Sequence, residues 1–254
     1  MPTPTASGRF TARARPTRML LGKVPHHKTG AFTSHRKFLA DKEYGEALDT
    51  LVKACSDMLL LSPDGNKIFL GKRLVQPQPD WWFVGGRIFP GETPARSCCR
   101  LLKRELGLEI DPARMQPVCA QSLAWGMREQ LPKENGTTDS QVVLSLQLTE
   151  AEVEKVVLDP KEYETSQWLE PQAILDGDFH PALKFAVSSL LGSRKLQELT
   201  DAVNSHPSND VEVAKLAREL IALTASNPVR EGTSEYRVVA PKLQYECDVE
   251  VSFA

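Results

Sequence analysis

Several features are missing from this 254-residue chain, and each absence excludes a class of protein. No apolar run approaches the roughly eighteen residues that a membrane-spanning helix needs, so we expect no membrane partner. The five cysteines form no C-x-x-C pair, and the adjacent Cys98 and Cys99 would point apart on a helix. The cysteines therefore argue against a zinc site or a disulfide framework, and they favour a reducing compartment.

Acidic side chains are absent from the start of the chain, where Asp41 is the first acid. Eight basic residues precede it: Arg9, Arg13, Arg15, Arg18, Lys23, Lys28, Arg36 and Lys37. The whole chain has 31 basic and 33 acidic residues, so the part without those eight keeps 23 basic residues and a formal charge of −10. An acidic body is poorly suited to the phosphate backbone of nucleic acid, and we expect no nucleic-acid partner.

The leader, residues 1–37, is rich in arginine, serine and threonine. This composition is typical of a mitochondrial or plastid transit peptide, and it fits a disordered basic tail equally well. The expected localisation is therefore either organellar or cytoplasmic.

The rest of the chain has the composition of a globular protein, with 41% hydrophobic and 25% charged residues. Helices are predicted at residues 41–54, 150–157 and 181–191, besides one at 94–106. Strands are predicted at residues 58–61, 68–70, 118–124, 141–148 and 166–169, and at the tryptophan pair 81–82. This interleaving predicts an α/β fold, an α/β/α sandwich around a mixed β-sheet.

A C-terminal extension, residues 193–254, follows this pattern. We predict helices at 195–204 and 211–225, and an edge strand or hairpin within 236–251. The sequence assigns the extension no function. It either packs over the core or forms a homodimer.

The most informative segment is a short helix with clear boundaries. Thr93 and Pro94 are typical of the N-cap and the first helical position, and Gly107 is typical of a helix end. On this helix Leu101, Arg104 and Glu105 share a face. Glu92, just before the cap, is expected to reach Arg100.

Residues 85–108, GGRIFPGETPARSCCRLLKRELGL, resemble the Nudix box. The matching positions are Gly86, Glu92, Arg100, Leu102, Glu105, Gly107 and Leu108. The preceding Trp81–Gly86 resembles the W-W-x-P-G-G that often leads into the box. Two usual glutamates are replaced by Leu101 and Arg104, so Glu105 is the one helix carboxylate kept. The resemblance implies a Nudix-like fold and a small-molecule nucleotide substrate.

The replacement by leucine resembles the GDP-mannose mannosyl hydrolase branch of this superfamily. Residues 70–73 resemble that branch's L-G-K-R, residues 142–144 its V-V-L strand, and residues 158–169 its metal-and-base loop. The likeness covers residues 38–192, which we take as the Nudix domain. It implies one Mg²⁺, or Mn²⁺, bound by the Gly86 carbonyl, Glu105 and Glu162. Glu162 stands where the branch has glutamine, and a carboxylate is a better ligand for magnesium.

The branch's general base, a histidine, is replaced here by Tyr163. Free tyrosine titrates near pH 10, so it is a poor base at neutral pH. We hypothesise that Glu162 binds metal and that Glu164, or Glu162 itself, orients the attacking water. Arg104 either contacts a substrate phosphate or repels the metal and marks an inactive site.

Four further residues are candidates for substrate binding. Arg73 and Arg87 flank the box and could contact phosphate, or they could be ordinary surface charges. Trp82 and Trp125 could support a base or sugar, or they could belong to the core. Glu105 too has a plain alternative, an ion pair with Arg100 or Arg104.

The sequence as a whole favours a magnesium-dependent hydrolase of a nucleoside diphosphate-linked substrate, such as the nucleotide sugar GDP-mannose. Attack at the sugar carbon or at phosphorus stays open. The first alternative is a broader nucleoside di- or triphosphate hydrolase. The second is a Nudix-like nucleotide-binding module without turnover.

Overall fold

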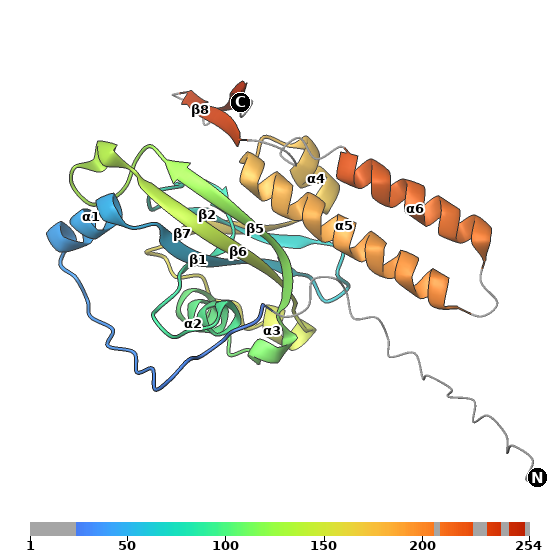
Figure 1. Cartoon of the computed structure of the whole chain (residues 1–254), viewed down its shortest axis with the longest axis horizontal. Coiled ribbons are helices and arrows are strands. Elements are labelled where there is room, and N and C mark those ends of the chain that lie inside the picture. The colour runs from blue at the N-terminus through green and yellow to red at the C-terminus, as the bar shows by residue number, and fades with distance from the viewer. Residues whose placement is uncertain (1–23, 206–208, 226–232, 240–243, 252–254) are drawn as a thin grey trace, which may run out of the picture.

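The computed structural model describes residues 24–205, 209–225, 233–239 and 244–251, shown in Figure 1. Most of the basic leader, residues 1–23, lies outside them. Residues 24–40 have no regular secondary structure. Within the described residues, no helix is both long and apolar enough to cross a membrane.

A mixed sheet forms the centre of the protein. Its strands are β1 (Lys53–Leu61), β2 (Ile68–Arg73), β3 (Trp81–Trp82), β4 (Val84–Arg87), β5 (Gln116–Trp125), β6 (Thr137–Gln147) and β7 (Tyr163–Leu169). They follow the order β3-β2-β1-β6-β5, with β4 paired to β1 and β7 paired to β2. β1 and β6 are parallel over their full register, and the other pairs are antiparallel. The five strands predicted as ranges are confirmed, and all five are longer than predicted.

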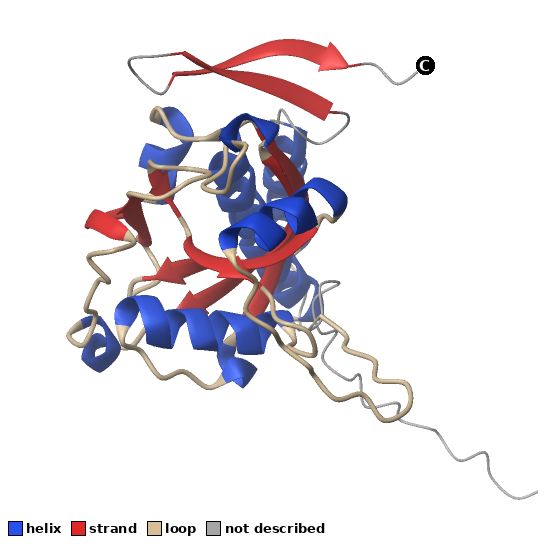
Figure 2. Cartoon of the chain, turned by 90° about the vertical axis from the view of Figure 1, so that its left-hand side faces the viewer, coloured by secondary structure: helices blue, strands red, loops and turns tan. Residues whose placement is uncertain are grey.

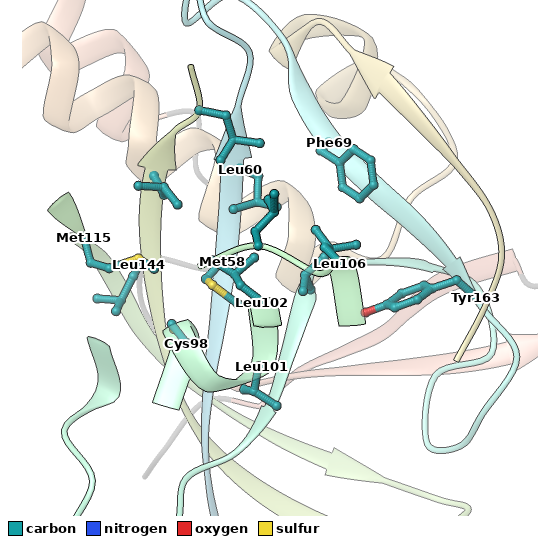
Figure 3. Packing of buried hydrophobic residues seen from close by; sticks show 14 residues of the cluster. Met58, Leu60, Phe69, Cys98, Leu101, Leu102, Leu106, Met115, Leu144 and Tyr163 are labelled. Carbon is teal, nitrogen blue, oxygen red and sulfur yellow. The ribbon is translucent and has the colours of Figure 1, made fainter. Parts of the chain in front are cut away.

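Helices cover both faces of this sheet (Figures 1 and 2). On one face α2 (Pro94–Leu106) packs against β1 residues Met58 and Leu60. On the other face α5 (Pro181–Asn204) packs against Leu59 and Leu61. The alternation along β1 directs side chains to two separate cores, and Figure 3 shows the core beneath α2. The predicted α/β/α sandwich around a mixed sheet is confirmed.

Two predicted helices are shorter in the structure. α1 (Asp41–Thr50) ends before Leu51, whose backbone is extended, and Leu51 and Val52 are exposed. The chain must straighten there because β1 begins to pair with β6 at Lys53. α3 (Glu150–Val153) ends early as well. The remaining short helices are α4 (Pro171–Asp176) and the 3₁₀ turns η1 (Pro112–Arg114) and η2 (Lys133–Asn135).

The extension differs from prediction where it begins. The helices predicted at 181–191 and 195–204 are one continuous helix, α5, which passes through Gly192. Its second half packs against α6 (Asp210–Ala225), with Lys195 3.0 Å from Glu219. Of the two alternatives for residues 236–251, an edge strand or a hairpin, the structure has the hairpin, which begins three residues earlier: β8 (Thr233–Val239) and β9 (Gln244–Val251) pair antiparallel. The division into domains at residue 192 stays a prediction, although it falls inside a helix.

Candidate active site

Helix α2 begins and ends where the sequence predicts. The Thr93 side chain accepts a hydrogen bond from the Arg96 amide at 3.2 Å, and Pro94 is the first helical residue. Gly107 has a φ of 71°, a left-handed conformation that closes the helix. These two caps fix where α2 begins and ends.

The loop before α2 is held by the predicted contact between Glu92 and Arg100. The Arg100 guanidinium donates to both Glu92 oxygens, at 2.7 and 2.8 Å, and to the Arg87 carbonyl at 2.9 Å. Partial burial acts to raise the pKa of Glu92, but the hydrogen bonds from Arg100 and the Phe89 amide hold it below its ordinary value. Glu92 and Arg100 are thus structural partners that shape the loop.

Glu105 is the central carboxylate of the site, and its side chain is only 1% exposed. The Tyr163 hydroxyl donates to its Oε2 at 2.5 Å, and Arg104 donates to its Oε1. Figure 3 shows Tyr163 with its hydroxyl directed toward the helix that carries Leu102 and Leu106. Burial raises the pKa of Glu105, while Tyr163 and Arg104 oppose this shift. Both oxygens of Glu105 are therefore engaged by protein donors.

Tyr163 thus has a partner that sequence reasoning did not supply. Its own pKa is raised by burial and by the charge of Glu105, which excludes it as a base at neutral pH.

Removing this hydroxyl tests the contact. We expect Tyr163→Phe to lower the free energy of unfolding by about 2 kcal/mol, because a buried carboxylate loses a donor. Urea denaturation at neutral pH measures the change. Tyr44→Phe is the control, since that ring lies half-buried against Arg87 and should lose less than about 0.5 kcal/mol. Equal losses in both variants would contradict the contact.

The two loop acids lie in different surroundings. A Glu162 oxygen is 3.8 Å from Arg104, and the other is 3.9 Å from Arg73, so Glu162 lies beside Glu105 across a shared guanidinium. Glu164 pairs with Lys72 at 2.9 Å and is largely exposed. Adjacent residues of a strand face opposite ways, so Glu164 points away from Tyr163 and Glu105. This geometry does not support the predicted part of Glu164 in orienting water.

A divalent cation does not fit the donors as they are arranged. Among the described residues, no group of three or more histidine, cysteine or acidic side chains could hold a metal ion. Each oxygen of Glu105 already accepts a hydrogen bond, from Tyr163 or from Arg104, and Glu162 faces two guanidinium groups. A hard cation needs several free oxygen ligands and would be repelled by these arginines. The metal set predicted from Gly86, Glu105 and Glu162 stays a prediction that this geometry does not favour.

Sequence reasoning missed a second buried acid, Asp57 of β1. The Gln141 amide donates to its Oδ2 at 2.5 Å, and burial raises its pKa to about 7, with Arg73 opposing. A Cβ atom at Gly85 would lie 2.0 Å from Oδ1 of Asp57, so only glycine permits this approach. The signal was present, since one acid interrupts the apolar run of β1.

The predicted aromatic platforms lie on the other side of the sheet. Trp82 is 3% exposed and belongs to the core beneath α5, where its ring is 5.6 Å from that of Trp125 and 5.1 Å from that of His180. Trp125 is the last residue of β5, one residue beyond the strand predicted at 118–124, and donates to Asp139 at 2.9 Å. It also borders a hollow of about 610 Å³. The structure does not bring Trp82 or Trp125 to Glu105, and the core alternative fits Trp82.

Two of the three predicted basic side chains, Arg73 and Arg104, lie at the site, whereas Arg87 lies against aromatic rings. Arg73 ends β2, is 17% exposed, and counteracts the raised pKa values of Asp57, Glu105 and Tyr163. Arg104 is 49% exposed. Arg87 ends β4 and lies over the Tyr44 ring at 4.9 Å. Cationic groups thus line the approach to two buried acids.

The chain also matches a known protein family. The NUDIX domain family matches residues 54–187. An RNA pyrophosphohydrolase of Gluconobacter oxydans (strain 621H) is 27% identical over 127 residues, which is 46% of this chain and 71% of that protein.

Two solved structures are also similar. A MutT NUDIX hydrolase from Burkholderia pseudomallei is 18% identical with a TM-score of 0.45, covering 55% of this chain and 98% of that one. An Ap4A hydrolase of C. elegans is 15% identical with a TM-score of 0.40, covering 55% and 96%.

Proposed function

The chain belongs to the NUDIX domain family, and from that premise we propose that it recognises a nucleoside diphosphate linked to a sugar or a similar group. One observation carries the choice of recognition over metal-assisted hydrolysis. Both oxygens of Glu105 are bound, one by Tyr163 and one by Arg104. The last carboxylate kept in the box is therefore committed to the protein itself.

The charges at the entrance support a phosphate-bearing ligand. Arg73 and Arg104 lie beside Glu105 and Glu162 and carry planar guanidinium groups, which suit phosphate oxygens because they donate two parallel hydrogen bonds. The nucleotide-sugar class comes from the resemblance of residues 70–73 and 158–169 to the GDP-mannose branch. GDP-mannose is accordingly the first ligand to test.

Hydrolysis is the second candidate, and family membership together with the closeness of Glu105 and Glu162 favours it. Both acids lie against Arg104. Magnesium-dependent hydrolysis would therefore require these two carboxylates to bind the cation. The named relatives include an RNA pyrophosphohydrolase and an Ap4A hydrolase, so the substrate could also be a broader nucleotide.

A ligand panel separates these candidates. Purified protein is titrated calorimetrically with GDP-mannose, other nucleotide sugars, GDP and GTP, and the mixtures with Mg²⁺ are then analysed chromatographically. We expect a nucleotide sugar to bind without release of GDP or of a monophosphate. Magnesium-dependent product release, abolished by Glu105→Gln, would instead establish the hydrolase. Absence of binding across the whole panel would refute the proposal.

Arg73→Gln supplies a sharper test of the same panel. Losing one phosphate-facing guanidinium is expected to weaken binding about tenfold or more. Arg96→Gln is the matched control, because Arg96 is an exposed arginine on α2 and its loss should leave the affinity unchanged.

A further inference from the structure

We infer that the guanidinium group of Arg104, with Arg73 beside it, takes the place of a divalent cation at Glu105 and gives this domain a diphosphate site that works without metal. The inference rests on the proposed function for the identity of its ligand. It adds two statements to the proposed function. The guanidinium of Arg104 is the cation that contacts the phosphates, and binding does not depend on Mg²⁺.

The first step is the position of Arg104 between two acids. Its Nη2 donates to Oε1 of Glu105 and lies 3.8 Å from Oε1 of Glu162. A metal ion coordinated by these two carboxylates would have to occupy the same space. Arg104 directly precedes Glu105 in α2, and its long side chain turns toward the buried acid and contacts it.

The second step is the charge balance of the cluster. Two guanidinium groups, those of Arg73 and Arg104, face two carboxylates, those of Glu105 and Glu162. Tyr163 adds a neutral hydrogen bond to Glu105. Arg73 also acts on the buried Asp57, so the arginines offset most of the negative charge of the cluster. A free divalent cation, which requires an excess of negative charge, is attracted only weakly to such a cluster.

The third step is the capacity of Arg104 to bind an anion as well. Among the described residues, both of its ion pairs use Nη2, while half of the side chain is exposed. A guanidinium has five N–H donors in a fixed plane, and these two ion pairs leave the donors of Nη1 and Nε unused. Arg104 can thus hold Glu105 on one edge and phosphate oxygens on the other, as a bound metal bridges protein and phosphate.

Direct metal binding tests the substitution without any nucleotide. Mn²⁺ is titrated into the wild-type chain, Arg104→Glu and Arg96→Glu, with uptake followed by electron paramagnetic resonance. We expect Arg104→Glu to raise the Mn²⁺ affinity about tenfold or more, because it removes a cation and adds a carboxylate beside Glu105. Arg96→Glu makes the same charge change on an exposed part of α2 and should bind no better than wild type. Equal affinities in all three proteins, or tight Mn²⁺ binding by the wild type, would overturn the inference.

Arg104→Gln guards against misfolding of the glutamate variant, since it removes the cation without adding charge. Its Mn²⁺ affinity should also exceed that of wild type, by a smaller factor. Folding of every variant is checked by circular dichroism.

The ligand half is tested with GDP as the probe, in EDTA and in Mg²⁺. The wild-type affinity should change by less than about twofold between the two buffers, and Arg104→Gln should weaken it about tenfold in both. A tenfold loss of wild-type binding in EDTA would overturn the inference while leaving the proposed function intact. If GDP bound in neither buffer, both the proposed function and the metal-independent binding of diphosphate would be contradicted. The Mn²⁺ titration would still test separately whether Arg104 occupies the place of a cation.

Discussion

Replacing Gly85 by alanine is expected to lower the free energy of unfolding by about 3 kcal/mol or more. A Cβ atom at this position would lie 2.0 Å from Oδ1 and 2.7 Å from Cα of Asp57. β4 and β1 are paired directly at these two residues, so the backbones cannot separate without breaking the strand pairing. Urea unfolding followed by circular dichroism measures the loss.

Gly126→Ala is the matched control for this prediction. A Cβ atom at Gly126 would meet nothing within 4 Å, so its stability should stay within about 0.5 kcal/mol of wild type. If Gly85→Ala were as stable as Gly126→Ala, then Asp57 would not approach β4 as closely as the structure has it.

The second large effect concerns the charge of Asp57 itself. Burial raises its folded-state pKa from 3.8 to about 7, so the folded protein holds a proton that the unfolded chain releases near pH 4. Stability must then fall as the pH rises between these two values, and it levels off above pH 7. The shift corresponds to a loss of about 4 kcal/mol.

Asp57→Asn removes this dependence, because the amide keeps the shape of the neutral acid and does not titrate. Compared with wild type, the variant should gain about 4 kcal/mol of relative stability between pH 4 and pH 8. Thermal or urea unfolding across that range measures the difference. Asp41→Asn, an exposed substitution in α1, should follow the wild-type pH profile. A constant difference between Asp57→Asn and wild type at every pH would refute the shift.

The parts of the fold that the sequence predicted are those set by local signals. Thr93 and Pro94 determine where helix α2 begins, and Gly107 determines where it ends. Each of these residues acts only on the helical turn next to it. The contact between Glu92 and Arg100 spans eight residues and follows from the same loop and helix.

The remaining parts depend on contacts between distant segments. Tyr163 and Glu105 are 58 residues apart, and no local pattern shows that this hydroxyl will donate to that carboxylate. The end of α1 is set by pairing between β1 and β6, which overrides the helical character of Leu51 and Val52. Matching a motif was enough to select the site residues. It could not predict which hydrogen bonds they form.

The continuity of α5 bears on how the protein can be divided. The first half of this helix fills the core beneath the sheet with Leu183, Val187 and Leu190. Its second half carries Arg194, which donates to the Gly65 carbonyl in the β1–β2 turn at 2.9 Å, and Lys195, which pairs with Glu219 of α6. A chain shortened at residue 192 would therefore end within a helical turn and lose the Arg194 anchor. Fragments prepared for study should retain all of α5, to Asn204, because the core and the extension share this one helix.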